Sequence, residues 1–153
     1  MKPRVVVTGM GVAAPNGVGL KAFSAALRAG RSGIRYYERL AEMKFSCCIG
    51  GEPEVTEEMK LHYLTPLQLR NFRSTGILNG CMAGVDAWED AGLERRPADA
   101  EPDWDTGIVF GMGNSGVDQM REAAYKLDDG KVRRLGSTTV PQIMASGVSA
   151  YLG

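Results

Sequence analysis

The chain has 153 residues, and its 18 lysines and arginines are balanced by 18 aspartates and glutamates, which gives a formal net charge of +0. This balance speaks against a nucleic-acid partner, which would require a basic excess. No apolar run approaches the roughly 20 residues of a membrane span, and the N-terminus has no signal-peptide core, so we expect a cytoplasmic protein.

The first predicted element is a strand over Arg4–Thr8, a short apolar run that is typical of a strand buried on both faces. It leads into Gly9-x-Gly11, two glycines at the spacing found in dinucleotide-binding turns. A helix is expected from Leu20 to about Leu27, with Gly30 at the position of a left-handed cap.

Residues 31–51 predict a loop with one short strand around Phe45–Ile49, and residues 52–66 predict short helical turns. The longest helical signal follows, from after Pro66 to Ala91, with Gly92 as its stop. One face carries apolar residues and the neighbouring face small ones: Phe72, Ile77, Cys81, Val85 and Trp88 beside Gly76, Gly80, Ala83, Gly84 and Ala87. Because glycine inside a helix costs up to about 1 kcal/mol relative to alanine, we expect close tertiary contacts and a buried centre.

The C-terminal part of the sequence repeats the pattern of a strand followed by a glycine turn. After a charged loop over Glu94–Asp105, a strand is expected at Thr106–Phe110, then the turn Gly111-x-Gly113-x-x-Gly116 and a helix from about Val117 to Leu127. Pro141 suits the first position of a last helix. Strands and helices that alternate around a long insertion are typical of an α/β fold.

Both glycine turns lack the surroundings of a nucleotide site. The first needs a helix that begins inside the motif, but Pro15-Asn16-Gly17 predicts a turn there. The second has its candidate acids, Asp128 and Asp129, in a turn directly after a helix and not on a second strand. The remaining reason for such glycines is that a backbone or a ligand passes close to them. We therefore expect a crowded site.

Few side chains point to catalysis. His62 is the only histidine, which excludes a two-histidine metal site and favours a structural role. The sequence has three cysteines: Cys47, Cys48 and Cys81. They fit neither a disulfide framework nor paired zinc ligands, and we expect them to behave as small hydrophobes. Arg70 and Arg73 form either an anion-binding patch or an ordinary solvated helix face.

Four stretches of the sequence form a recognisable set: RVVVTGMGVAAPNGVGLKAFSAALRAGRSGI at 4–34, GVDAWEDAGL at 84–93, GIVFGMGNSG at 107–116 and MASGVSAYLG at 144–153. Together they resemble the N-terminal part of a β-ketoacyl-acyl-carrier-protein synthase, most of all the bacterial type I condensing enzymes. The resemblance implies a thiolase-like α/β fold, built from two related βαβαβ halves without a nucleotide site. Residues 1–153 would form its N-terminal domain, a mixed sheet packed by helices that stops before the expected nucleophile.

The family's reaction is a decarboxylative Claisen condensation. A cysteine thiolate takes an acyl group, and two histidines stabilise the enolate formed from malonyl-acyl-carrier protein. The nucleophile belongs to an alanine-cysteine pair that this sequence lacks, and His62 matches neither histidine. The resemblance therefore assigns no catalytic residue here, and we expect the 153-residue chain alone to be inactive and to use no cofactor or metal.

The resemblance does assign residues on the substrate side. Four of them are expected to border the acyl pocket, beside the interface of a homodimer or of a heterodimer with a second ketosynthase-like subunit: Gly111, Gly113, Asn114 and Met144. Asn114 departs from the small or apolar residue usual there, which leaves room for a more polar or unsaturated polyketide chain. Arg70 and Arg73 lie near the position where the family docks the acidic acyl carrier protein.

Two functions remain in competition. The leading one is acyl-chain elongation in fatty-acid or polyketide synthesis, with this chain as the N-terminal part of the synthase. The alternative is a non-catalytic, chain-length-factor-like partner, which keeps the fold and lacks the cysteine. A nucleotide-dependent oxidoreductase is disfavoured because both glycine motifs fail in their surroundings.

Overall fold

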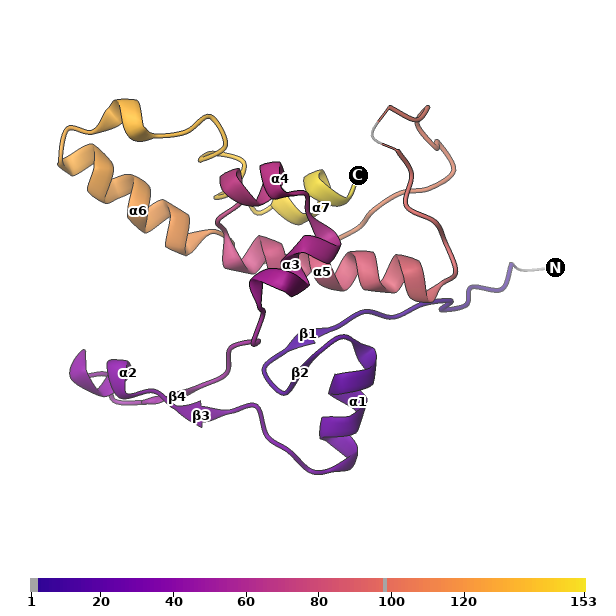
Figure 1. Ribbon diagram of the computed structural model, residues 1–153, viewed down its shortest axis with the longest axis horizontal. Helices are drawn as coiled ribbons and strands as arrows, with labels where there is room; N and C mark the ends of the chain where they lie inside the picture. The colour runs from indigo at the N-terminus through magenta and orange to yellow at the C-terminus, as the bar shows by residue number, and fades with distance from the viewer. Residues whose placement is uncertain (1–2, 98) are drawn as a thin grey trace.

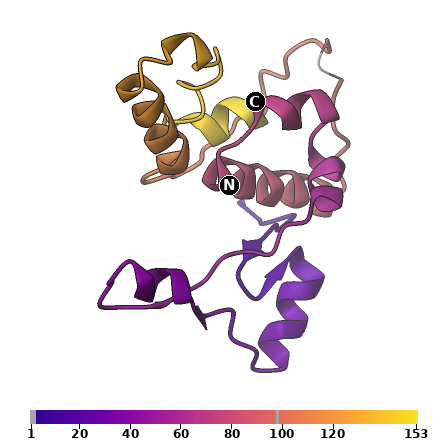
Figure 2. The same ribbon diagram turned by 60° about the vertical axis from the view of Figure 1, so that its left-hand side comes forward.

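The computed structural model describes residues 3–97 and 99–153. Its elements are, in chain order, β1 (Ala13–Ala14), β2 (Gly17–Val18), α1 (Leu20–Arg28), β3 (Arg35–Tyr36), α2 (Glu38–Glu42), β4 (Ile49–Gly50), α3 (Glu57–Tyr63), α4 (Pro66–Asn71), α5 (Thr75–Asp90), α6 (Val117–Asp128), the 3-10 helix η1 (Val132–Arg134) and α7 (Gly147–Leu152). Figure 1 and Figure 2 show α3, α4 and α7 gathered around α5, while α6 and the arm made of β3, α2 and β4 extend away from it. Among the described helices, none combines the length and apolar character that crossing a membrane requires.

The strands form two short antiparallel pairs. In the first pair Ala13 lies opposite Val18, joined by a turn at Pro15 and Asn16 that confirms the turn predicted there. In the second pair Arg35 lies opposite Gly50 at the base of the arm. Helices and strands thus coexist in a mixed α/β fold, as predicted.

The predicted strands at Arg4–Thr8 and Thr106–Phe110 are wrong for this structure. Within the described residues neither segment pairs with a neighbour, and their apolar side chains lie in solvent: Val5 is 96% exposed and Val109 is 101% exposed. A strand forms only where another backbone satisfies its amide and carbonyl groups, and an apolar run cannot indicate where that backbone comes from. Of the predicted strand at Phe45–Ile49, only its last residue belongs to β4.

The long helix predicted after Pro66 is interrupted. Phe72 and Ser74 have extended backbones, with ψ of 109° and 111°, so that α4 ends at Asn71 and α5 begins at Thr75. The amides of Arg73 and Ser74 donate to the side-chain oxygen of Gln142, at 2.5 and 3.1 Å. A distant glutamine thus satisfies donors that a continuous helix would have bonded internally.

Two other helices begin where expected, and one does not. The helix α1 starts at Leu20, and Gly30 after it has φ of 63°, which confirms the left-handed cap. The helix α6 begins at Val117, as predicted. The last helix begins at Gly147 and not at Pro141, because Pro141 lies in a series of turns that includes a bond from the Met144 amide to the Val140 carbonyl at 3.2 Å.

The core lies along α5, which confirms its predicted buried centre. Its buried residues come from α5, from the segment before it and from α7: Phe72, Ile77, Leu78, Cys81, Met82 and Val148. The small residues permit this packing. A methyl group at Gly80 would press on Val148, one at Gly84 would collide with Leu152, and one at Gly147 would collide with Ile77.

The two glycine turns differ in their surroundings. A Cβ at Gly9 would collide with the carbonyl of Ala87, and a Cβ at Gly11 with that of Ala83, because this backbone crosses α5 at close range. At the second turn, the Cβ positions of Gly111 and Gly113 have no atom within 4 Å. The expectation of crowding is confirmed at the first turn and wrong at these two glycines.

Candidate functional site

The glycine turn before α6 and the segment that contains Met144 lie side by side. The Ser115 hydroxyl donates to the Met144 carbonyl at 2.9 Å, and Ser115 is buried, 6% exposed. Gly116 has φ of 62° and lies directly against the carbonyl of Gln142. The structure therefore joins two segments that are 29 residues apart in sequence.

Gln142 is the residue that sequence reasoning missed. It is 3% exposed, its Oε1 accepts from two amides at the start of α5, and its Nε2 donates to the Thr138 carbonyl and hydroxyl, both at 3.1 Å. A glutamine after a proline carries no local signal for such a role. Its importance follows from fitting between two segments that only the fold brings together.

The residues predicted to border an acyl pocket lie at the surface. Gly111, Gly113 and Asn114 are exposed, and Met144 is 50% exposed. Met144 is next to this turn through the bond from Ser115. The structure thus brings Met144 next to the residue that follows Asn114, and all four predicted positions are open to solvent.

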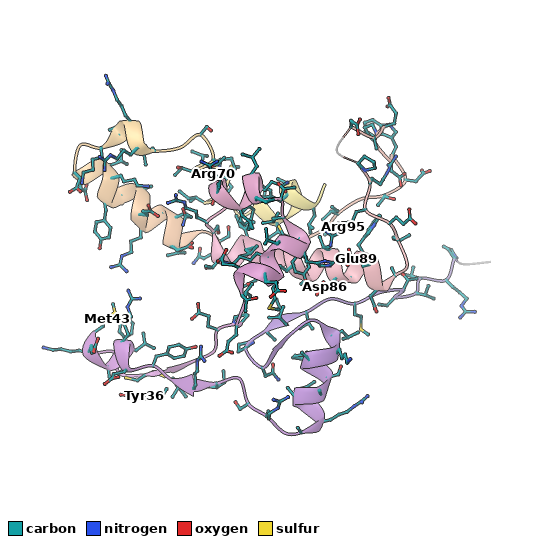
Figure 3. The ribbon with its side chains drawn as sticks, in the orientation of Figure 1. Tyr36, Met43, Arg70, Asp86, Glu89 and Arg95 are labelled. Carbon is teal, nitrogen blue, oxygen red and sulfur yellow. The ribbon has the colours of Figure 1, made fainter. Side chains whose placement is uncertain are left out.

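The two predicted docking arginines differ in their contacts. Arg70 lies on the exposed side of α4 and forms no ion pair with a described residue (Figure 3). The Arg73 guanidinium lies 3.7 Å from Glu122 on α6, which also pairs with Lys126 at 2.7 Å. The hydrogen bond from Lys126, with smaller help from Arg73, lowers the pKa of Glu122. Arg73 is therefore partly neutralised, whereas Arg70 is available to an acidic partner.

A polar network joins α3, the end of α5 and the loop that follows (Figure 3). Arg95 donates to Glu89 at 2.7 Å and to the carbonyl of His62 at 2.7 Å. Partial burial acts to raise the pKa of Glu89, but hydrogen bonds with His62 and Arg95 outweigh it, so this pKa is lowered. His62 is one of the three members of this surface network, which agrees with the structural role expected for it.

A groove of about 620 Å³ lies between α1 and the second half of α5. Tyr63, Lys21 and Asp86 are among its lining residues. The Tyr63 hydroxyl donates to Asp86 Oδ1 at 2.8 Å, and burial, followed by this bond, raises the pKa of Tyr63. Asp86 Oδ2 is buried without a hydrogen-bond partner among the described residues. The carboxylate of Asp86 thus keeps one buried acceptor unpaired beside the groove. The described residues contain no group of three His, Cys, Asp or Glu that could hold a metal ion.

The three cysteines differ in their burial. Cys81 is 4% exposed in the core, and burial raises its pKa to about 11, so it is a neutral thiol at pH 7. Cys47 is exposed on the arm, which differs from the expectation that it packs as a small hydrophobe. Cys48 beside it is half-buried.

Comparisons with known proteins give one consistent result. The sequence profile described as "Beta-ketoacyl synthase, N-terminal domain" matches residues 2–153. The chain is 30% identical over 154 residues to 3-oxoacyl-acyl-carrier-protein synthase 2 of Vibrio harveyi, covering 99% of this chain and 35% of the relative. It is 32% identical over 123 residues to the tetracenomycin polyketide synthase ketoacyl synthase beta subunit of Streptomyces glaucescens, covering 80% of this chain and 29% of the relative.

Solved structures share the fold. A β-ketoacyl synthase from Burkholderia phymatum superposes with a TM-score of 0.73 at 21% identity, covering 99% of this chain and 36% of that one. The ishigamide ketosynthase/chain length factor superposes with a TM-score of 0.72 at 24% identity and the same coverage. The chain thus spans about a third of the length of the proteins it matches.

Proposed function

Because the chain belongs to the β-ketoacyl synthase family, whose N-terminal domain profile matches residues 2–153, we propose that residues 1–153 are the N-terminal domain of a condensing enzyme in fatty-acid or polyketide synthesis. The profile match carries this proposal because it extends over nearly the whole chain. The relative from Vibrio harveyi, a 3-oxoacyl-acyl-carrier-protein synthase, supports the same reaction class.

The proposed reaction joins an acyl thioester to malonyl-acyl-carrier protein with loss of CO₂. The new carbon–carbon bond forms between the malonyl C2 and the acyl carbonyl, and the acyl group leaves the enzyme thiolate that carried it. In this chain Cys81 is a buried neutral thiol and His62 is bound to Glu89 and Arg95. Neither suits the thiolate or enolate-stabilising role, so this domain is proposed to contribute the acyl-binding side and not the nucleophile.

The proposed acyl-binding surface contains Gly111, Gly113, Asn114 and Met144. Its support is the hydrogen bond from Ser115 that fixes the glycine turn against the Met144 backbone at 2.9 Å. A flexible thioether suits a wall that adapts to acyl chains of different length. In a catalytically active protein that contains this domain, Met144→Trp should shorten the acyl products. An unchanged distribution of product lengths would show that Met144 does not line the pocket.

Arg70 and Arg73 are the proposed docking residues for an acidic acyl carrier protein. Both are exposed, and among the described residues Arg73 has an acidic neighbour within ion-pair distance, Glu122, whereas Arg70 has none. We expect Arg70→Glu to weaken carrier binding more than Arg73→Glu does, most clearly at low salt, where surface charge is less screened. The matched control reverses two exposed arginines near the end of α1, Arg28→Glu and Arg31→Glu, and should leave binding unchanged.

A second candidate function is a chain-length-factor-like partner of an active ketosynthase. It is favoured by the 32% identity to the ketoacyl synthase beta subunit from Streptomyces glaucescens. The ishigamide ketosynthase/chain length factor shares the fold and gives no further support for this role. In this role the domain would shape the acyl tunnel of its partner without forming a bond itself.

The test is a condensation assay with acyl- and malonyl-carrier protein, read by mass spectrometry of the carrier-bound products. The 153-residue chain is assayed alone and together with a ketosynthase that has its own active cysteine. We expect no product from the chain alone, and product there would overturn the assigned roles. A changed product length in the mixture supports the partner role. Failure both to bind carrier protein and to affect the ketosynthase would overturn the proposed function.

A further inference from the structure

Gln142 uses both ends of its side-chain amide, which offers two acceptor sites and two donors. Its Oε1 accepts from the backbone amides of Arg73 and Ser74, just before α5, and its Nε2 donates to the carbonyl and the hydroxyl of Thr138. A flipped amide would point its NH₂ group at two N–H donors, so these partners allow one orientation only. The side chain of Gln142 therefore joins the start of α5 to the segment that leads to α7.

The backbone of Gln142 is held as well. Its amide donates to the Thr138 carbonyl at 3.2 Å, and its carbonyl lies so close to Gly116 that a side chain there would collide with it. Figure 1 and Figure 2 show the chain returning from the far end of α6 to α7, which packs against α5. Gln142 thus lies buried between the start of α5 and the glycine turn before α6.

Met144 follows two residues later in the same series of turns. Its amide donates to the Val140 carbonyl at 3.2 Å, and its carbonyl accepts from the Ser115 hydroxyl at 2.9 Å. Its side chain is half-exposed, so the place of the thioether depends on its backbone more than on packing around it. The bonds of Gln142 to the start of α5 therefore decide where Met144 stands relative to the core.

We propose that Gln142 is a positioning residue for product length: by holding the segment 138–144 against α5, it sets the place of Met144 in the acyl pocket. The inference rests on the proposed function, in which Met144 borders that pocket. A binding site keeps its geometry only where supporting side chains are locked by packing and hydrogen bonds, and Gln142 is such a support. Because it is buried, it acts through Met144 and does not touch the acyl chain.

The first test compares product lengths by mass spectrometry, in a catalytically active protein that contains this domain. Gln142→Leu keeps a side chain of similar bulk and loses the bonds to Arg73, Ser74 and Thr138. We expect the share of products shorter or longer than the main one to rise roughly threefold or more, because Met144 is no longer held in one place. An unchanged distribution from a folded, active variant would overturn the proposal.

A loss of stability alone should not change product length. Thr56→Ala is the matched control, because it removes the side-chain acceptor of the Met59 amide at the start of α3. It should lower the unfolding temperature and leave the distribution unchanged. In a Met144→Ala background, Gln142→Leu should change the distribution little, since the residue through which it acts is gone. An equal change in both backgrounds would show that Gln142 does not act through Met144, which contradicts the proposal.

The last test uses the 153-residue chain and no acyl substrate. In Gln142→Leu, NMR should show the amides of Arg73 and Ser74 exchanging with solvent roughly tenfold faster or more, and the methyl signal of Met144 should move or split. Gln142→Glu keeps an oxygen for both amides and should retain their slower exchange. Unchanged exchange and an unchanged Met144 signal would refute the role of Gln142. A parent protein that elongates no acyl chain would instead refute the proposed function, and the length role with it.

Discussion

The two glycine turns have the same spacing and opposite surroundings. At the first turn the backbone of Gly9 and Gly11 crosses α5, where no side chain would fit, whereas Gly111 and Gly113 face open space. The same glycine spacing thus occurs where two backbones cross in close contact at the first turn and in an exposed bend at the second. The comparison shows that a glycine pattern indicates a backbone without side chains. Whether a side chain would collide there depends on the segment packed against the turn, which the pattern does not reveal.

The largest effect is expected at the centre of the crowded turn. Gly11→Ala places a methyl group against the Ala83 carbonyl, which belongs to the backbone of α5 and cannot rotate away. We expect the free energy of unfolding to fall by about 3 kcal/mol or more, measured by urea unfolding followed by circular dichroism. A variant as stable as the wild type would show that this crossing is looser than described.

The next largest effect is expected at Gly116, the glycine of the second turn that is closely packed. Gly116→Ala must adopt φ of 62° and also meet the Gln142 carbonyl. Left-handed backbone costs an alanine roughly 1–2 kcal/mol, and the collision adds to it, so we expect a loss of about 2–3 kcal/mol. Gly130→Ala is the control, because Gly130 has φ of 69° with no atom near its Cβ position. Equal losses in the two variants would argue against the contact with Gln142.

A smaller effect concerns the link between the second turn and Met144. Ser115→Ala removes the hydroxyl that donates to the Met144 carbonyl at 2.9 Å. The loss should be about 1 kcal/mol, the usual net contribution of such a bond, and is read from thermal unfolding. Ser149→Ala, which removes an exposed bond to the Ser146 carbonyl, should cost less. The opposite order would mean that the Ser115 bond does not hold the two segments together.

The smallest effect is expected at the open glycine that matches Gly11 in position. Gly111→Ala meets no atom within 4 Å, so its free energy of unfolding should stay within about 0.5 kcal/mol of wild type. Urea unfolding of Gly111→Ala and Gly11→Ala under the same conditions measures the free energy of unfolding of both variants. A large loss at Gly111 would remove the difference between the turns.

Local patterns predicted the helices that depend on local features. The spacing of Leu20, Phe23 and Leu27 predicted α1, and the glycines within a long apolar helix predicted the buried centre of α5. Both features act between residues a few positions apart, which a single sequence displays.

What failed depends on distant residues. The break before α5 is held by Gln142, which is 68 and 69 residues away from the amides that it accepts. The expected strands at Arg4–Thr8 and Thr106–Phe110 needed neighbouring strands for backbone hydrogen bonds. The sequence of each segment does not indicate which neighbour that would be. Of the candidate site, the residues came from the family resemblance, while the bond between Ser115 and Met144 became visible only in the fold.

Gln142 gives the two proposed surfaces a shared support. Its side chain holds the amide of Arg73 on the proposed carrier-docking side, and its backbone belongs to the segment that reaches Met144 on the proposed acyl side. A shift of this segment therefore changes the hydrogen bonds at the start of α5. Under the proposed function, thermodynamic reciprocity requires an acyl chain and the carrier protein to change each other's affinity by the same factor. Substitutions at Arg73 and Met144 should then not be additive.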